Sequence, residues 1–156
     1  MAVRVARGAG DLYAIVEMAR RFTTETGYDI AFDPEPATNY IWSFIESESC
    51  DALVWDEGGT ISGGALVAVS HEAHAQPFCY ICKFFVAPEA RRSRAAREII
   101  SACIEWSRQR DCSHVFSTAT AGLSEKEQRL AVNLLKRCGL EDVGPVMALK
   151  LGKAHG

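Results

Sequence analysis

The sequence predicts a single domain of mixed α/β class, in which helices pack on a sheet. Segments with an apolar residue every three to four positions alternate with short runs of β-branched and aromatic residues. One of these runs, Phe78–Val86, is apolar on both faces, which is typical of a central strand covered on both sides. A chain of 156 residues that is 48% hydrophobic fits one core, so we expect one domain over residues 1–156.

The first expected elements are a strand and two helices. Val3–Val5 reads as a short strand, and after a break at Gly8–Gly10 the apolar residues recur with helical spacing until Gly27 ends the helix. Tyr28–Pro36 is rich in Asp, Glu and Pro and is expected to be irregular. The apolar positions of Ala37–Ile45 then predict a second amphipathic helix.

A hairpin and the central strand follow. The strands Ala52–Trp55 and Ile61–Val69 flank Asp56–Thr60, where paired glycines can adopt the positive φ angles of a tight turn. The loop His71–Pro77 leads into the central strand Phe78–Val86. These segments therefore predict three adjacent strands in the sheet.

The remaining elements alternate between helices and short strands. The buried stripe of a long helix runs from Ala96 to Ser107, and His114–Phe116 is expected to be a buried strand. Ser124–Glu127 has the capping-box spacing of a helix start, which makes the next helix a firm prediction. After Gly139, which suits the left-handed turn that closes that helix, two final strands are expected. These two strands are Leu140–Val143 and Val146–Leu151.

The charge balance argues against several classes of partner. Seventeen Lys and Arg face 20 Asp and Glu, and the net charge of -3 provides no overall field that favours nucleic acid or membrane. No apolar run approaches the ~18 residues that span a bilayer, and the first residues lack the apolar core of a signal peptide. We expect a cytoplasmic protein that binds neither nucleic acid nor membrane. The oligomeric state stays open, with a homodimer as one alternative.

The cysteines and histidines raise the alternative of a zinc site. The six cysteines lie mostly in apolar periodic segments, which favours reduced, buried thiols. His71 and His74 precede Cys79 and Cys82 with a spacing that resembles a metal site. Residues three apart on a strand point to opposite faces, however, so the two cysteines could chelate only if the strand were broken. We therefore expect no metal.

The start of the long helix carries an unusual cluster of positive charge. Its arginines are Arg91, Arg92, Arg94 and Arg97. Positive charge at a helix start is repelled by the positive end of the helix dipole, and each cation there destabilises the helix by roughly 0.3 to 1 kcal/mol. A bound phosphate would instead interact favourably with the dipole, the free amides and the guanidinium groups together. The alternative is that the arginines are solvated and pair with Glu89 or Glu98. The preceding buried strand favours the phosphate site.

Residues Val86–Ala96 resemble the acyl-CoA signature of the GNAT superfamily of N-acyltransferases. In that signature a strand ends in Val-x-Pro-Glu-x and is followed by Arg-x-x-Gly-x-Gly/Ala. Ala131–Leu140 is more weakly similar to the family's Ala-x-x-Leu-Tyr-x-x-x-Gly-Phe. The resemblance implies a three-layer α/β/α fold with a splayed central sheet. It also implies transfer of an acetyl group from acetyl-CoA to a primary amine of a small molecule or protein, by direct attack in a ternary complex.

The resemblance also assigns residues to the co-substrate. The pyrophosphate would lie on the helix start, formed by Arg91, Arg92, Ser93, Arg94, Ala95 and Ala96. Phe85 and Val86 would pair their main chain with pantetheine, and Gln128 stands where the family often has asparagine. The thioester would lie in a gap that opens between the strands Phe78–Val86 and His114–Phe116.

Two departures from the family pattern have different consequences. Arg94 replaces a glycine, but a residue that enters a right-handed helix does not need to be glycine, so phosphate binding is expected to survive. Leu135 stands where the family often has the tyrosine that protonates the departing thiolate. An acyl-CoA-binding or regulatory module with weak or no catalysis is therefore the alternative to an enzyme.

Candidates for the proton transfers are few. Tyr80 lies on the central strand near the place where the family often has a carboxylate, although an ordinary pKa near 10 makes it a poor base. His71 in the preceding loop is a second candidate, because histidine is the side chain that ordinarily exchanges a proton near neutral pH. The alternatives to these proton-transfer roles are that Tyr80 is an ordinary core residue and that His71 is an ordinary solvated residue. The acidic residues that flank the second helix would suit a cationic acceptor, and they equally fit a solvated surface: Asp29, Asp33, Glu35, Glu46 and Glu48.

Overall fold

A five-stranded sheet with four α-helices forms the part of the chain that the computed structural model describes, which is residues 2–26, 30–118, 124–144 and 149. The order of elements is β1 (Val3–Val5), α1 (Gly8–Glu25), α2 (Pro34–Glu46), β2 (Cys50–Glu57), β3 (Thr60–Ser70), β4 (Phe78–Val86), the 3-10 turn η1 (Pro88–Ala90), α3 (Ala95–Arg108), β5 (His114–Ser117) and α4 (Glu125–Arg137). The strands lie in the order β1-β2-β3-β4-β5. Only β4 and β5 pair in parallel.

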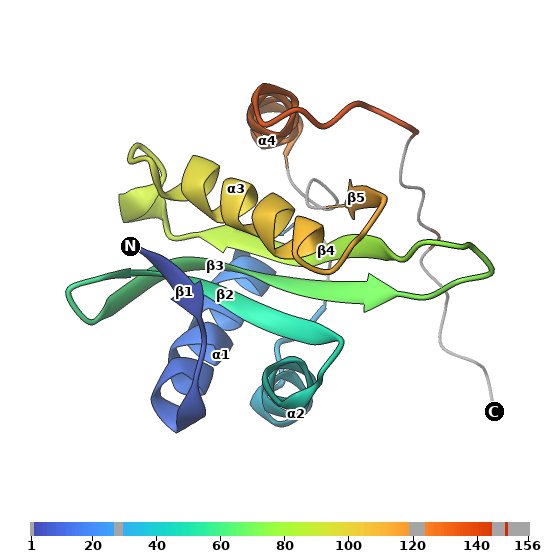
Figure 1. Cartoon of the computed structure of the whole chain (residues 1–156). Coiled ribbons are helices and arrows are strands. Elements are labelled where there is room, and N and C mark those ends of the chain that lie inside the picture. Colours follow the sequence, from blue (N-terminus) through green and yellow to red (C-terminus); the bar gives the residue numbers. More distant parts are fainter. Residues whose placement is uncertain (1, 27–29, 119–123, 145–148, 150–156) are drawn as a thin grey trace, which may run out of the picture.

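The sheet is covered by helices on both faces (Figure 1). Helices α1 and α2 lie on one face, here called the α1/α2 face, and α3 lies on the other with α4 beside it. Alternate residues of the strands feed two cores, so that Trp55 and Ile81 pack with α3 whereas Val54 and Leu66 pack with α1 and α2. This is the predicted α/β arrangement of three layers.

A β-bulge divides β4 into two halves. Leu66 of β3 is opposite Lys83, but the next residue, Val67, is opposite Ile81, so Cys82 is the extra residue. Pairing with β5 ends at the same place, where Ile81 is opposite Ser117. In the described part of the chain, the β5-side edge of β4 therefore has no ladder partner after the bulge. The predicted gap between these strands begins here.

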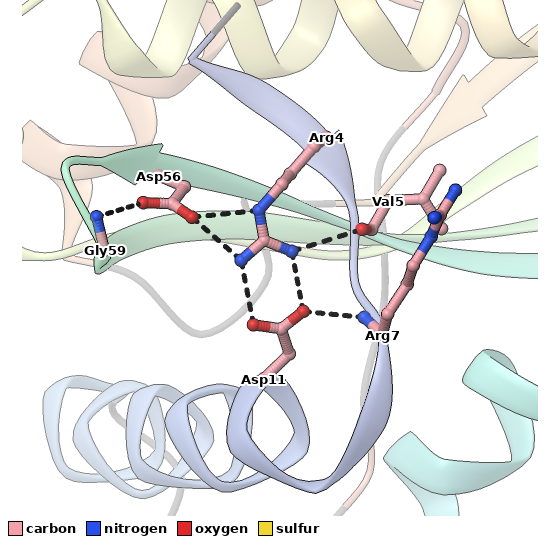
Figure 2. Close-up of polar contacts among 6 residues, drawn as sticks. All are labelled: Arg4, Val5, Arg7, Asp11, Asp56 and Gly59. Atoms are coloured by element: carbon pink, nitrogen blue, oxygen red, sulfur yellow. Dashed lines mark hydrogen bonds and ion pairs between the residues drawn. The ribbon is translucent and has the colours of Figure 1, made fainter.

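A polar network fixes the start of α1 to the sheet (Figure 2). The Arg4 guanidinium on β1 donates to both Asp11 oxygens, at 2.6 and 2.9 Å, and to Asp56 on β2 at 2.9 Å. Asp11 also accepts from the Arg7 amide at 2.6 Å, which satisfies a free donor at the helix start. Because of these contacts, Gly8 begins α1, and the break predicted at Gly8–Gly10 is wrong.

Several predicted boundaries and one strand differ from the structure. Helix α2 begins at Pro34, because the Asp33 side chain caps it and prolines suit a first turn. Strand β5 is half-exposed rather than buried, since it has a single partner strand among the described residues. Residues 140–143 form no strand, and Val143 is 80% exposed. Apart from Leu149, the predicted strand at 146–151 lies outside the described residues, as does the predicted helix end at Gly27.

Other predictions about the elements are confirmed. Gly58 and Gly59 form the hairpin turn with φ of +64° and +89°, and Ser124 and Glu127 make the capping box. Gly139 has φ of +95° after α4. None of the described helices is long and apolar enough to cross a bilayer.

The cysteines are free and do not gather into a metal site. Cys79 and Cys103 are buried, and the other four are half-buried. Cys79 packs on the α3 side of the sheet, whereas Cys82 packs on the α1/α2 face, as strand geometry predicts. In the described residues, no group of three or more His, Cys, Asp or Glu is placed to hold a metal ion.

Candidate active site

The turn between β4 and α3 presents unused backbone donors. Within it, the Ser93 amide donates to the Ala90 carbonyl at 3.0 Å and the Ala95 amide donates to the Ser93 hydroxyl at 3.1 Å. The amides of Arg92, Arg94 and Ala96 make no hydrogen bond to the described residues. Free N–H groups at the start of a 14-residue helix form an anion site, because they add to the positive end of its dipole.

The arginines of this turn divide into engaged and free side chains. Arg91 donates to the Val86 carbonyl at 2.9 Å, forms an ion pair with Glu25 of α1, and lies 5.7 Å from the centre of the Phe85 ring. In contrast, Arg92 is exposed and has no partner among the described residues. The alternative of pairing within the cluster holds for one arginine, because Arg94 contacts Glu98 at 3.1 Å.

The acidic partner of the turn comes from a distant element. Arg21 of α1 contacts Glu89 at 2.8 Å, and the hydrogen bond from this guanidinium lowers the pKa of Glu89 to about 2. Glu89 is thus unavailable to Arg91, although the sequence places them close together. Arg94 has φ of -73° and ψ of -7°, which confirms that the position of the family's glycine takes a right-handed conformation here.

The free edge of β4 is the second part of the site. The Ala87 amide donates to Ser62 at 2.8 Å, and hydrogen bonding alternates along an antiparallel pair, so the backbone of Phe85 faces Gly64. The backbone of Val86 therefore faces the open edge. Its carbonyl is occupied by Arg91, which leaves its amide as the donor beside the gap.

A pocket of about 370 Å³ lies between the α1/α2 face and the second half of β4. Its walls come from α1, α2 and strands β2, β3 and β4, and include Met18, Phe22, Ile41, Leu66 and Phe85. Lys83 is the only charged side chain among its described lining residues. The volume is within the usual range of roughly 300–1,000 Å³ for sites that bind small molecules.

The proposed proton-transfer residues lie outside this pocket. The Tyr80 hydroxyl donates to the Glu72 carboxylate at 2.9 Å, and this hydrogen bond raises the pKa of Tyr80 above its ordinary value. Its ring stacks on Phe116 of β5 with centroids 5.5 Å apart. His71 is exposed and has no hydrogen bond, ion pair or ring contact with a described residue. The structure thus brings Tyr80, but not His71, beside the start of the gap.

Helix α4 supplies the last predicted positions. The backbone amide of Gln128, in the first turn, donates to Ser124 at 2.8 Å. Leu135 packs against the core on the α3 side, so its side chain supports the attachment of α4. The Arg91 guanidinium helps to lower the pKa of Glu127, although the hydrogen bond from Ser124 is the larger cause. The start of α4 therefore lies near enough to the turn between β4 and α3 for electrostatic coupling with Arg91.

Sequence reasoning missed the pocket and the partners of two candidate residues. Glu72 and Glu25 could not be paired with Tyr80 and Arg91, because the contacts join different elements. The apolar spacing of α1 and α2 was visible, but spacing does not reveal that the helices leave a space over the sheet. None of the described acidic residues that flank α2 lines the pocket.

Comparisons with known proteins agree with this geometry. The sequence model of the acetyltransferase (GNAT) family matches residues 12–140. No curated protein matches the sequence significantly. An acetyltransferase from Trypanosoma brucei is 19% identical with a TM-score of 0.73, and the alignment covers 96% of this chain and 98% of that one.

Two aminoglycoside acetyltransferases have the same fold. The enzyme meta-AAC0020, from an uncultured soil metagenomic sample and bound to sisomicin, is 15% identical with a TM-score of 0.69, covering 97% of this chain and 96% of that one. The enzyme AAC(6')-Iy in complex with CoA is 14% identical with a TM-score of 0.75, covering 96% and 93%. At these identities the structures establish the shared fold.

Proposed function

Because this chain belongs to the GNAT family of acetyltransferases, we propose that it transfers the acetyl group of acetyl-CoA to a primary amine by direct attack in a ternary complex. One observation carries the proposal. Among the described residues, the amides of Arg92, Arg94 and Ala96 have no hydrogen-bond partner, and they lie at a helix start that directly follows the open edge of β4. A cluster of backbone N–H donors that can bind phosphate, beside a free strand edge, suits a ligand with a pyrophosphate and an extended amide-bearing arm.

Each part of acetyl-CoA then has a proposed partner. The pyrophosphate lies on the turn Arg91–Ala96, where the exposed Arg92 guanidinium adds a charge-assisted contact. Pantetheine runs along β4, and the Val86 amide is the donor available to it, whereas the Phe85 backbone is turned toward β3. Gln128 at the start of α4 contacts the same arm.

The chemistry requires no redox partner. The amine nitrogen attacks the thioester carbon, a C–N bond forms, and the C–S bond breaks with the electron pair on sulfur. One proton leaves the nitrogen and the thiolate gains one. Backbone donors near Val86 polarise the carbonyl. Tyr80 and His71 remain the proposed proton carriers, with Tyr80 acting as a neutral hydroxyl because Glu72 keeps its pKa high.

Calorimetry with acetyl-CoA tests the phosphate site. We expect saturable binding that weakens at least tenfold in Arg92→Glu, because the exposed side chain would then repel the pyrophosphate. Arg7→Glu is the matched control, since Arg7 is also an exposed arginine at a helix start. It lies at the N-terminal end of α1, whereas the turn Arg91–Ala96 contacts the C-terminal end of that helix. Equal loss in both variants, or no binding to the unmodified protein, contradicts the proposal.

An acyl-CoA-binding or regulatory module is the second candidate. The observation in its favour is Leu135, which stands at the position where the family often has the tyrosine that acts as acid. Its side chain has no ionisable proton to donate and packs against the core. Release of free CoA thiol across a panel of amines separates the two candidates. Turnover supports the enzyme, whereas tight binding of acetyl-CoA without turnover on any amine supports the module.

A further inference from the structure

The pocket on the α1/α2 face has unusually apolar walls for a site that receives amines. Its described lining includes Ile15, Met18, Ala19, Phe22, Ile41 and Leu66, and no Asp or Glu. Lys83 at its edge is exposed and carries positive charge. A second cation placed in this pocket would lose its hydration without gaining a carboxylate partner among the described lining residues, which is unfavourable.

Two threonine hydroxyls in the walls are already satisfied. The Thr23 hydroxyl donates to the Ala19 carbonyl at 3.0 Å, and the Thr26 hydroxyl donates to the Thr23 carbonyl at 3.0 Å. Both bonds are internal to the end of α1, so these two donors are already engaged without an occupant. Burial of apolar surface is therefore the main source of affinity for an occupant.

The position of the pocket points to the acceptor. The inner wall includes Cys82 and Phe85, the part of β4 that follows the bulge and has lost its β5 partner. The outer rim carries the exposed apolar side chains of Ile30 and Tyr40, at 66% and 45% exposure. An occupant can thus come from solvent, pass apolar side chains, and end beside the strand at which the thioester is proposed to lie.

We infer that this pocket binds the body of the acceptor, and that the acceptor is a primary monoamine with an apolar alkyl or aryl chain rather than a polyamine or aminoglycoside. This inference rests on the proposed function and specifies its substrate class. The same walls assist the chemistry, because desolvation disfavours the charged ammonium and increases the fraction of neutral amine that can attack. A weaker base than would be required in water is then enough to keep the attacking amine neutral.

A homologous series of amines tests the inference with unmodified protein and acetyl-CoA. From propylamine to hexylamine, we expect kcat/KM to rise about fourfold for each added methylene until the pocket is filled. Hexylamine and 1,5-diaminopentane form a matched pair of equal length in which a terminal methyl is replaced by a second ammonium. We expect the diamine to react at least tenfold more slowly. A flat series, or a preference for the diamine, would overturn the inference.

A substitution that fills the pocket provides the structural control. Ala19 lines the pocket from α1, whereas Ala9 is an exposed residue of the same helix outside it. Ala19→Phe should remove the dependence on chain length and reduce kcat/KM for hexylamine at least tenfold, with little effect on propylamine. Ala9→Phe should behave like the unmodified protein. Thermal unfolding of each variant checks that it folds. If Ala19→Phe does not fold, the amine series on the unmodified protein still decides between the outcomes.

Two further measurements separate the inference from the proposed function and from another occupant. Calorimetry of hexylamine and the diamine with CoA-saturated protein reads the pocket without turnover. Tighter binding of hexylamine supports the inference even if no amine is acetylated, while turnover without selectivity keeps the proposed function and overturns the inference. If hexanoyl-CoA reacts faster than acetyl-CoA and the amine series is flat, the pocket holds the acyl chain, and the inference is wrong.

Discussion

The Tyr80 hydroxyl donates a 2.9 Å hydrogen bond to Glu72, which stabilises the protonated phenol and raises its pKa. We expect Glu72→Gln to lower the pKa of Tyr80 toward its ordinary value near 10, because an uncharged acceptor stabilises the protonated form less. Tyrosinate absorbance measured against pH, with Tyr80→Phe subtracted to remove the other three tyrosines, reports this shift. An unchanged titration of Tyr80 in Glu72→Gln would show that the carboxylate does not control it.

Arg91 and Arg92 are neighbours in sequence with different structural roles. Arg91 joins the Val86 carbonyl, Glu25 and the Phe85 ring, whereas Arg92 is exposed without a described partner. We expect Arg91→Ala to lower the free energy of unfolding by about 1 kcal/mol, a modest value because the side chain is 40% exposed. Arg92→Ala should leave it unchanged. Urea unfolding compares the two variants, and equal losses would contradict this division.

At the scale of one element, the β2–β3 hairpin isolates the cost of backbone conformation. Gly58 has φ of +64°, and a Cβ added there would meet nothing within 4 Å. We expect Gly58→Val to destabilise the protein by about 1 to 2 kcal/mol through the backbone alone. Gly58→Asn should cost less, because asparagine tolerates the left-handed region. The midpoints of urea unfolding measure both, and equal midpoints for Val and Asn would contradict the argument.

The elements that could be predicted carry their signal in local residues. The capping box needs only Ser124 and Glu127, and the hairpin needs only its paired glycines. The errors arose where the answer depended on tertiary neighbours. The apolar spacing at His114–Phe116 predicted a buried strand, but the number of strands that flank β5 decides its exposure. Similarly, Val143 continues an apolar pattern and is nevertheless 80% exposed.

The candidate site divides along the same line. The helix start at Arg94 and its right-handed backbone could be predicted, because a helix start depends on a few consecutive residues. The bulge at Cys82 could not, since it is defined by the register of β4 against β3. The pocket proposed to bind the acceptor could not either, because its walls are contributed by five elements.

At the scale of the whole molecule, helix α1 connects the parts of the proposed site. Near its C-terminal end, Arg21 forms an ion pair with Glu89 and Glu25 forms one with Arg91. Both partners lie in the segment between β4 and α3. The middle of the helix forms a wall of the pocket. Its first turn is joined to β1 through the contact of Asp11 with Arg4, and Arg4 in turn contacts Asp56 of β2 (Figure 2). The position of this helix therefore affects both the turn that is proposed to bind phosphate and the pocket that is proposed to bind the acceptor.

The network at the start of α1 should make the stability of the fold depend on pH. Arg4 lowers the pKa of Asp11, so this carboxylate stabilises the folded state above its unfolded pKa of 3.8, and the contribution is lost as the pH falls through the lower folded pKa. We expect Asp11→Asn to reduce the free energy of unfolding by about 1 to 2 kcal/mol at pH 7. The difference from the unmodified protein should shrink as the pH falls below 3.8, the unfolded pKa of Asp11.

Urea unfolding across this pH range measures the difference, and Glu57→Gln is the control. Glu57 is an exposed acid on the same hairpin as Asp56 without a described partner, so its substitution should have little effect at any pH. Because Asp11 contacts Arg4 of β1 and the Arg7 amide, its loss frees the first turn of α1 from the sheet. A difference that persists at low pH would mean that packing or helix capping, rather than the charge of Asp11, holds that end of the helix in place.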